Sequence, residues 1–220
     1  DLLNQNSNNY ICSVFQDEKN GVWGFAYTDI STGEFKVTEA SYELILAELV
    51  RINPAEVIGP SVRGDIQPFQ IVPDEKLKLP EEITKLYNCS KVPENVFSEQ
   101  MALRNLQAVF DANLEAYGYN NCKIGFRAAG ALLAYVWEML KDNFPRFERI
   151  EPYELSEYMI LDGGTRKNLE LTETIRDNSR TYSLLWLLDK TKTAMGSRYL
   201  KRNIESPLYN FCLATQLYMI

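Results

Sequence analysis

Side chains that could do chemistry are few in this sequence. It has no histidine, which excludes a Ser-His-Asp triad, imidazole acid/base catalysis and histidine metal ligands. The cysteines, Cys12, Cys89, Cys122 and Cys212, are far apart and form no CxxC pair. Neither a zinc site nor a disulfide framework is therefore expected, and reduced, mostly buried cysteines are the simpler interpretation. We predict no catalytic residue and no metal ligand.

Two segments resemble phosphate or metal sites only superficially. Gly163-Gly164-Thr165-Arg166 could present backbone amides at the start of a helix, but it lacks the GxxxxGK[ST] spacing of a phosphate loop. A plain helix N-terminus capped by Thr165 explains it better. The first expected strand carries Cys12-Ser13-Val14 at its centre, where a two-metal nuclease would need a carboxylate. We predict neither a nucleotide site nor a nuclease centre.

Charge is distributed unevenly along the chain. The net charge is −7, and residues 1–150, with 21 acidic and 14 basic side chains, hold all of the acidic excess. Residues 163–205 are locally basic, with nine lysines and arginines against five acids. The cations there that could contact DNA phosphates are Lys192, Arg198, Lys201 and Arg202. A solvated helix face with buried aliphatic stems explains the same cations equally well.

The expected elements begin with an antiparallel meander. Its strands are residues 10–15, 22–27 and 34–38, and its turns are residues 17–21 and 29–33. A helix capped by Ser41 and a buried strand at 56–59 follow, and this order predicts that the returning strand pairs in parallel. Asp29 stands where turn chemistry accounts for it.

The second part of the chain is predicted to be mainly helical. Residues 60–97 hold five of the nine prolines and suggest loops and short strands such as 69–72. The expected helices are residues 98–118, 126–141, 166–176, 182–188 and 193–204, the last stopped by Pro207. The best linker candidate is 143–157, and beyond it the only strand signal is at 159–161.

Several motifs, taken together, resemble those of one family. Residues 161–171 and 183–198, followed by Ser206-Pro207-Leu208, are similar to the start of the core domain of the MutS family of DNA mismatch repair proteins. Residues 29–35 and 53–56 resemble the connector domain of that family. The matching core positions, to which we assign structural roles, are Asp162, Thr165, Arg166, Asn168, Leu169, Glu170, Leu188, Asp189, Thr191, Met195, Gly196, Arg198 and Pro207.

The resemblance implies a fold class and a domain division. Residues 1–148 would be the connector, a non-catalytic, ribonuclease-H-like mixed sheet with helices. Residues 149–220 would begin the α-helical core, or lever, domain. In the core motif, Asp162 and Thr165 are expected to cap a helix in which Arg166 and Glu170 pair at i,i+4. Met195-Gly196 is expected to permit close approach of another helix.

The resemblance also implies a role. In this family the connector relays the nucleotide state and contacts MutL, and the core links the mismatch-reading and clamp domains to a distant ATPase. We therefore expect relay and MutL docking without enzymatic activity of the chain's own. ATP, magnesium, mismatched DNA and homodimerisation are expected of the parent protein. No signal segment or apolar run of membrane-spanning length is evident in the sequence, and a cytoplasmic location is expected.

Two other functions stay open from the residues alone. One is a divergent ribonuclease-H-like nuclease, which the acid-free first strand disfavours. The other is a stand-alone interaction module, which the form of the two ends disfavours: the chain starts at Asp1 and stops within an apolar stretch, as a fragment would. Residues 209–220 do not continue the family pattern.

Overall fold

The computed structural model describes residues 10–61, 77–110, 114–155, 159, 161 and 163–208. These residues divide into two compact units. Of the described residues, the sheet unit comprises 10–45, 53–61, 77–110 and 114–153, and the helical unit comprises those from 154 onward together with Leu46–Ile52. The elements of the sheet unit are β1 (Tyr10–Gln16), β2 (Trp23–Asp29), β3 (Glu34–Ala40), α1 (Tyr42–Ile52, shared between the units), β4 (Glu56–Ser61), α2 (Glu81–Leu86), β5 (Cys89–Pro93), η1 (Glu94–Phe97), α3 (Glu99–Phe110), η2 (Tyr119–Asn121), α4 (Lys123–Leu140), η3 (Lys141–Asn143) and β6 (Glu151–Pro152).

One mixed sheet organises the first unit, with strand order β5-β4-β1-β2-β3-β6. The meander β1-β2-β3 is antiparallel, whereas β4 pairs in parallel with β1, as the strand–helix–strand order predicts. The meander turns also form as predicted, with Gly21 and Gly33 at φ +66° and +74°. The predicted fold class, a mixed sheet with helices followed by a helical segment, is confirmed.

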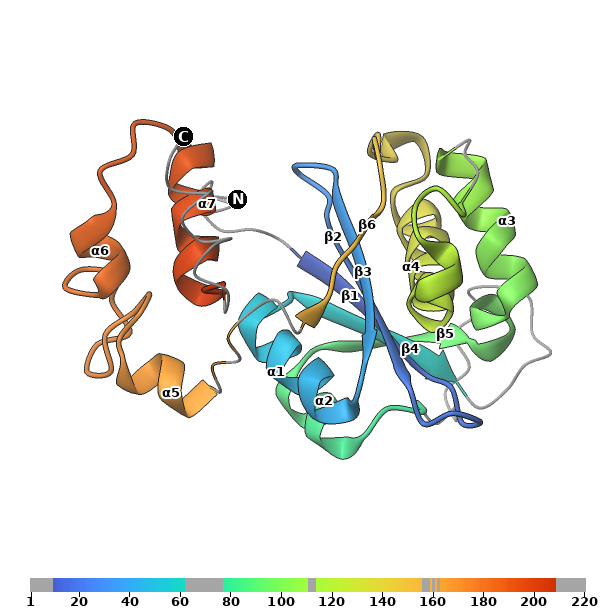
Figure 1. The fold of residues 1–220 in the computed structure, drawn as a ribbon, viewed down its shortest axis with the longest axis horizontal. Helices are drawn as coiled ribbons and strands as arrows, with labels where there is room; N and C mark the ends of the chain where they lie inside the picture. Colours follow the sequence, from blue (N-terminus) through green and yellow to red (C-terminus); the bar gives the residue numbers. More distant parts are fainter. Residues whose placement is uncertain are drawn as a thin grey trace. The chain divides into compact units, whose positions relative to one another are not determined.

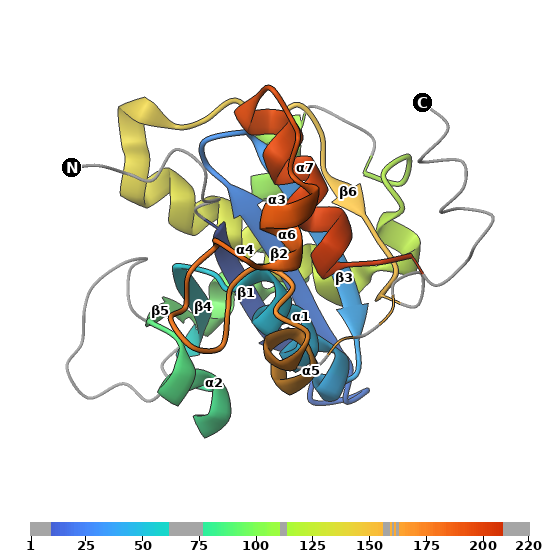
Figure 2. The same cartoon turned by 90° about the vertical axis from the view of Figure 1, so that its left-hand side faces the viewer.

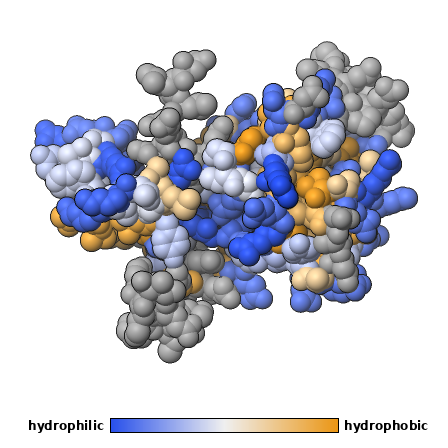
Figure 3. All heavy atoms as spheres, turned by 90° about the horizontal axis from the view of Figure 1, so that it is seen from above, coloured by the Kyte–Doolittle hydropathy of each residue, from blue (hydrophilic) through white to orange (hydrophobic). Residues whose placement is uncertain are grey.

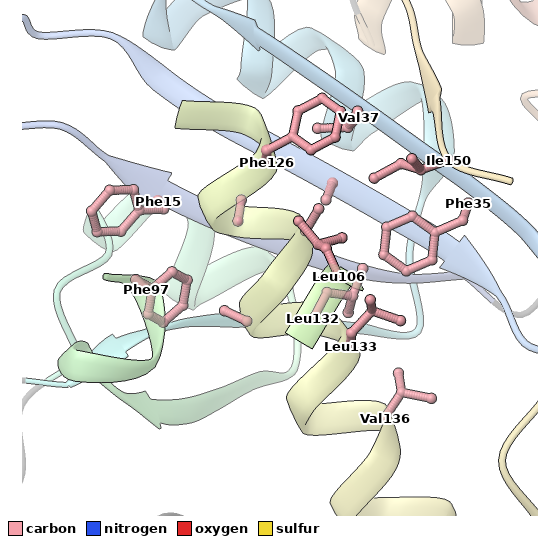
Figure 4. Packing of buried hydrophobic residues seen from close by; sticks show 14 of the residues in the cluster. Phe15, Phe35, Val37, Phe97, Leu106, Phe126, Leu132, Leu133, Val136 and Ile150 are labelled. Carbon is pink, nitrogen blue, oxygen red and sulfur yellow. The ribbon is translucent and has the colours of Figure 1, made fainter. Parts of the chain in front are cut away.

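The main hydrophobic core lies between the sheet and two helices. Figures 1 and 2 show α3 and α4 on one face of the sheet, whereas α1 begins on the other. Figure 4 shows the side chains that α4 sends into this core, among them Phe126, Leu132 and Val136, all fully buried. Phe35 from β3 meets Phe147 with ring centroids 5.3 Å apart. Since each fully buried side chain of this size stabilises the fold by about 1.5–3 kcal/mol, α4 is the main anchor of the sheet.

The carboxylate of Glu39, near the end of β3, provides a hydrogen-bond acceptor for the first backbone N–H groups of α4. It accepts hydrogen bonds from the backbone N–H groups of Ile124 at 2.9 Å and Gly125 at 3.4 Å. An anion is favourable there because the first amides of a helix have no intrahelical partner and carry partial positive charge. This long-range contact fixes the helix against the sheet.

Two predictions about the sheet unit are wrong, and a third holds only in part. The helix expected over 98–118 ends at Phe110, and residues 114–118 form turns closed by Gly118 at φ +82°. Residues 81–86, expected as loop, form α2. The boundary between the units, after Tyr153, does fall in the segment expected as linker. The part before it belongs to the sheet unit, because β6 pairs in parallel with β3 and the side chains of Phe147 and Ile150 are buried. The strand suggested at 69–72 lies outside the described residues.

From residue 163 to residue 208, the helical unit contains α5 (Gly163–Asn168), α6 (Leu184–Leu188) and α7 (Ala194–Glu205), which are joined by loops (Figure 2). Helix α5 stops at Asn168 rather than at residue 176, because Glu170 adopts φ +47° and the chain turns away. The side chains of Ser183 and Thr193 cap α6 and α7 by accepting hydrogen bonds from the backbone N–H groups of residues 186 and 196. Helix α7 runs one residue beyond the predicted end.

Candidate functional site

Asp189 is the centre of a polar network in the helical unit. It follows α6, and its Oδ1 accepts hydrogen bonds from the backbone N–H of Thr191 at 3.1 Å and from the Thr191 hydroxyl at 2.6 Å. Its Oδ2 accepts from the Ser197 hydroxyl at 2.6 Å and from the Arg180 guanidinium. Hydrogen bonds from Ser197 and Thr191 hold the pKa of the Asp189 carboxyl well below its usual range. The network ties the loop before α6 to the first turns of α7.

Arg166, in α5, joins two other parts of the helical unit. Its Nε donates to the Leu161 carbonyl at 2.9 Å, and its Nη2 donates to the Glu205 carbonyl at 2.7 Å. Partial burial lowers the pKa of Arg166, and burial raises the pKa of the Glu205 carboxyl. The predicted i,i+4 pair with Glu170 is wrong, because the Glu170 carboxylate accepts instead from the Ile175 N–H at 2.8 Å. Arg166 works as a cross-link between chain segments rather than as a helix-surface charge.

Two further expectations about the core motif are corrected. Thr165 lies inside α5, as its third residue, so it is not the N-cap. A Cβ added at Gly196 would lie 3.2 Å from the Thr191 Cβ and from the Thr193 hydroxyl oxygen. The close neighbour of Gly196 is therefore the loop before α7 rather than another helix, and Met195 is strongly exposed. Asp162 lies outside the described residues.

The remaining described motif residues lie at a helix end, at the surface or in a backbone hydrogen bond. Asn168 ends α5, and the side chains of Leu169 and Leu188 are about half exposed. The carbonyl of Pro207 accepts a hydrogen bond from the Met159 N–H at 2.8 Å. Sequence reasoning missed Arg180 and Ser197, which complete the Asp189 network. Their separation from Asp189, nine residues before it and eight after it, is too long to be read as a local motif.

Of the four predicted phosphate contacts, three share one face of α7. Arg198, Lys201 and Arg202 stand at i, i+3 and i+4. Lys201 Nζ lies 3.9 Å from the Glu205 carboxylate. Lys192 precedes the cap of α7 and is exposed. The structure thus gathers a basic face on α7 and leaves Lys192 outside the helix.

An apolar patch marks the end of α4 in the sheet unit. Trp137 is 58% exposed and Met139 is 45% exposed. The Trp137 ring lies 4.8 Å from that of Phe144. We call Trp137 and Phe144, whose rings are in contact, the α4 patch; Figure 3 shows hydrophobic atoms at the surface of this unit. Trp137 is the exposed member and the half-buried Phe144 supports it, and exposed aromatic side chains are enriched at protein interfaces.

Buried side chains without a carboxylate occupy the centre of β1. Cys12, Ser13 and Val14 are fully buried there. Among the residues that the structure describes, no group of three or more cysteine, aspartate or glutamate side chains could hold a metal ion. Asp29 has the predicted turn role, since its carboxylate accepts from the N–H and the hydroxyl of Ser31 at 2.8 and 2.6 Å. In the same described part of the chain, no helix is long and apolar enough to span a bilayer.

Comparison with known proteins agrees with this architecture. The family model for MutS domain II matches residues 9–148, and that for MutS domain III matches residues 164–212. DNA mismatch repair protein MutS of Trichodesmium erythraeum is 41% identical over 210 residues, which cover 94% of this chain and 23% of that protein. The MutS proteins of Acaryochloris marina and Microcystis aeruginosa are 39% and 38% identical over 94% of this chain. The chain spans about a quarter of the length of the curated relatives it matches. The chain belongs to the MutS family of DNA mismatch repair proteins.

Proposed function

We propose that this chain is the connector, residues 1–148, and the start of the core, residues 149–220, of a longer MutS protein. Its role there is to relay conformational change between mismatch-binding and ATPase domains. The observation that supports this most is the succession of matches to MutS domains II and III along one chain. The Asp189 network and the Arg166 cross-link suit the core part, because each ties separate segments into one stiff piece.

MutL docking is the second part of the proposal, and we place it at the α4 patch. Trp137 there is exposed, and Phe144 supports its ring at 4.8 Å. A rigid aromatic side chain that is already ordered loses little entropy on binding, which makes it suitable as an anchor. The patch also lies on the acidic connector, within the part matched to MutS domain II.

Binding of this chain to immobilised MutL tests the docking proposal. Trp137→Glu should weaken binding by about 30-fold or more, the effect of losing one anchor residue. Leu86→Glu is the matched control, since Leu86 is an exposed apolar residue of the same unit outside the patch. Equal binding by the wild type and Trp137→Glu would contradict the assignment of the patch.

The proposed role needs no chemistry from the chain itself. ATP and magnesium would belong to the ATPase part of the parent protein, and the parent would bind mismatched DNA as a homodimer. We expect the isolated chain to hydrolyse no ATP above a buffer blank and to prefer no mismatch. ATP turnover that co-purifies with the chain would overturn this expectation, and magnesium-dependent cleavage of a nucleic acid would revive the nuclease alternative.

DNA contact through Lys192, Arg198, Lys201 and Arg202 is a second candidate function. The shared face of Arg198, Lys201 and Arg202 on α7 favours it. Removing one phosphate contact should lower the slope of log affinity against log salt by about 1 in the full-length protein. Lys192→Ala and Arg202→Ala are the variants to compare, and unchanged slopes in both would argue against the contact.

A further inference from the structure

The chain leaves the sheet unit through a very short strand. Strand β6 consists of Glu151 and Pro152, and it pairs in parallel with the edge of β3 (Figure 1). Proline has no N–H to donate, so this pairing has fewer hydrogen bonds than an ordinary strand would make. The next residue, Tyr153, donates its N–H to the Val37 carbonyl at 3.0 Å and ends the unit. We call residues 151–153 the β6 latch.

The segment just before the latch is fixed in the hydrophobic core. The side chains of Phe147 and Ile150 are buried there, at 5% and 1% exposure. The latch itself is more accessible, since Pro152 is exposed and both Glu151 and Tyr153 are half-buried. If the latch leaves the sheet, the bend in the chain therefore falls between Ile150 and Glu151.

An ion pair closes the latch onto β3. Lys36 on β3 is buried, and its Nζ lies 3.4 Å from the Glu151 carboxylate. The same Nζ lies 3.5 Å from the carboxylate of Glu34, two residues earlier on β3. Glu151 in turn pairs with Arg149, two residues earlier on its own segment. Each member of the closing ion pair thus has a second, opposite charge on its own side.

This arrangement lowers the cost of opening the latch. Breaking a buried ion pair is normally costly because one charge stays buried without a partner. Here Lys36 keeps Glu34 and Glu151 keeps Arg149, so neither charge is left uncompensated. A strand of two residues that is closed by a shared ion pair can therefore detach while the core beneath it stays packed.

We propose that the β6 latch is a two-state element that sets the length of chain between the two units. In the closed state residues 151–153 pair with β3, and in the open state they join the connection to residues 154 onward. Three extended residues add up to about 10 Å of reach. The inference deepens the proposed relay and rests on it, because the closed and the open latch belong to different states of the longer protein.

Hydrogen exchange at the Tyr153 amide measures opening of the latch in the 220-residue chain, with mass spectrometry resolved to single residues. Glu34→Gln and Arg149→Gln each remove the second partner of one charge, so that opening leaves this charge alone. We expect exchange to slow by about fivefold in Glu34→Gln, the effect of one partly buried ion pair, and by less in Arg149→Gln, where the cation is exposed. Lys36→Met removes the closing pair and should speed exchange.

The direction of the change separates a latch from a static contact. A static edge strand loses stability, or loses nothing, when a neighbouring charge is removed. Unchanged or faster exchange in Glu34→Gln would therefore overturn the proposal. The control is the Val57 amide, which donates to the Asn88 carbonyl at 2.9 Å, and its exchange should stay within about twofold in all variants. A change at Val57 as large as that at Tyr153 would mean that the whole sheet opens, which also contradicts a latch.

Permanent closure tests the latch in the full-length protein. Lys36 and Glu151 are partners in the β3–β6 register, so Lys36→Cys together with Glu151→Cys allows a disulfide across the latch. We expect oxidation to lower the response of ATP turnover to mismatched DNA by at least about tenfold, and reduction to restore it. Each single cysteine variant is a matched control and should respond equally before and after oxidation.

The two proposals fail in different ways in these experiments. A normal response of the oxidised double variant to mismatched DNA would overturn the latch while the relay stands. A wild-type protein whose ATP turnover ignores the mismatch would contradict the relay itself. Hydrogen exchange in the 220-residue chain does not depend on ATP, DNA or MutL, so its result judges the latch alone.

Discussion

Substitution of Gly130 tests the packing of α3 against α4. A Cβ added at Gly130 would lie 2.3 Å from the Ala102 Cα, 2.6 Å from its Cβ and 2.8 Å from its carbonyl oxygen. Asn105 Nδ2, also on α3, donates to the Gly130 carbonyl at 3.1 Å. Two of the three crowded atoms are backbone, so rotation of a side chain cannot relieve the clash. The two helices must separate in Gly130→Ala.

Two effects of Gly130→Ala oppose each other. Alanine gains about 1 kcal/mol over glycine in a helix interior. Overpacking of a close-packed interior typically costs about 1–3 kcal/mol, and contact with backbone places this site at the upper end. We expect a net loss of about 1–2 kcal/mol in the free energy of unfolding. For a chain of this length, the midpoint of thermal unfolding should fall by roughly 2–8 °C.

Urea unfolding followed by circular dichroism measures this loss as a lower midpoint with an unchanged slope. The double variant Ala102→Gly with Gly130→Ala is the control. It removes the 2.6 Å contact with the Ala102 Cβ but keeps the 2.3 Å contact with backbone, and the glycine introduced in α3 itself costs about 1 kcal/mol. Stability should therefore stay below that of the wild type. A Gly130→Ala variant as stable as the wild type, or more stable, would refute the close approach of the helices.

Three further substitutions test polar contacts. For Asp189→Asn, the stability lost relative to wild type should be greatest above pH 4 and shrink as the pH falls below about 4. The reason is that the lowered pKa of Asp189 lets its carboxylate stabilise the fold only while it is ionised. Urea unfolding of both proteins at a series of pH values measures the difference in stability. Arg166→Lys should lose one of two hydrogen bonds to carbonyl oxygens and about 1–2 kcal/mol in urea unfolding, and an unchanged midpoint would contradict the cross-link. Glu39→Gln should cost about 0.5–1 kcal/mol in thermal unfolding, less at high salt, because the charge at the start of α4 is removed; a loss independent of salt would exclude that cause.

The sheet could be predicted from the sequence where local signals are strong. The turn glycines Gly21 and Gly33 and the alternating strands defined the meander, and the intervening helix defined the parallel return of β4. Strand β6 could not be predicted, because it has only two residues and its pairing is set by distant packing of Phe147 and Ile150. The helix α2 was missed because only Ile83 of its six residues is buried, which leaves no apolar period.

The candidate sites were predictable only in part. The family resemblance identified Asp189 and Thr191 as structural positions, and the structure shows the contact between them, a hydrogen bond of 2.6 Å. The contacts of Arg180 and Ser197 depend on the path of the loops, which the hydrophobic periodicity of the sequence does not predict. Likewise, Trp137 follows the buried Val136 on α4, and only the packing of the sheet decides which of the two faces solvent.

The most direct test of the account is capture of MutL by the full-length protein on mismatched DNA. Trp137→Glu should reduce capture by at least about tenfold. Its affinity for mismatched DNA and its ATP turnover should stay within about twofold of wild type, since the α4 patch would serve docking alone. Leu86→Glu should behave as wild type. Undiminished capture by Trp137→Glu, or capture lost only together with mismatch binding, would contradict docking of MutL at the connector surface.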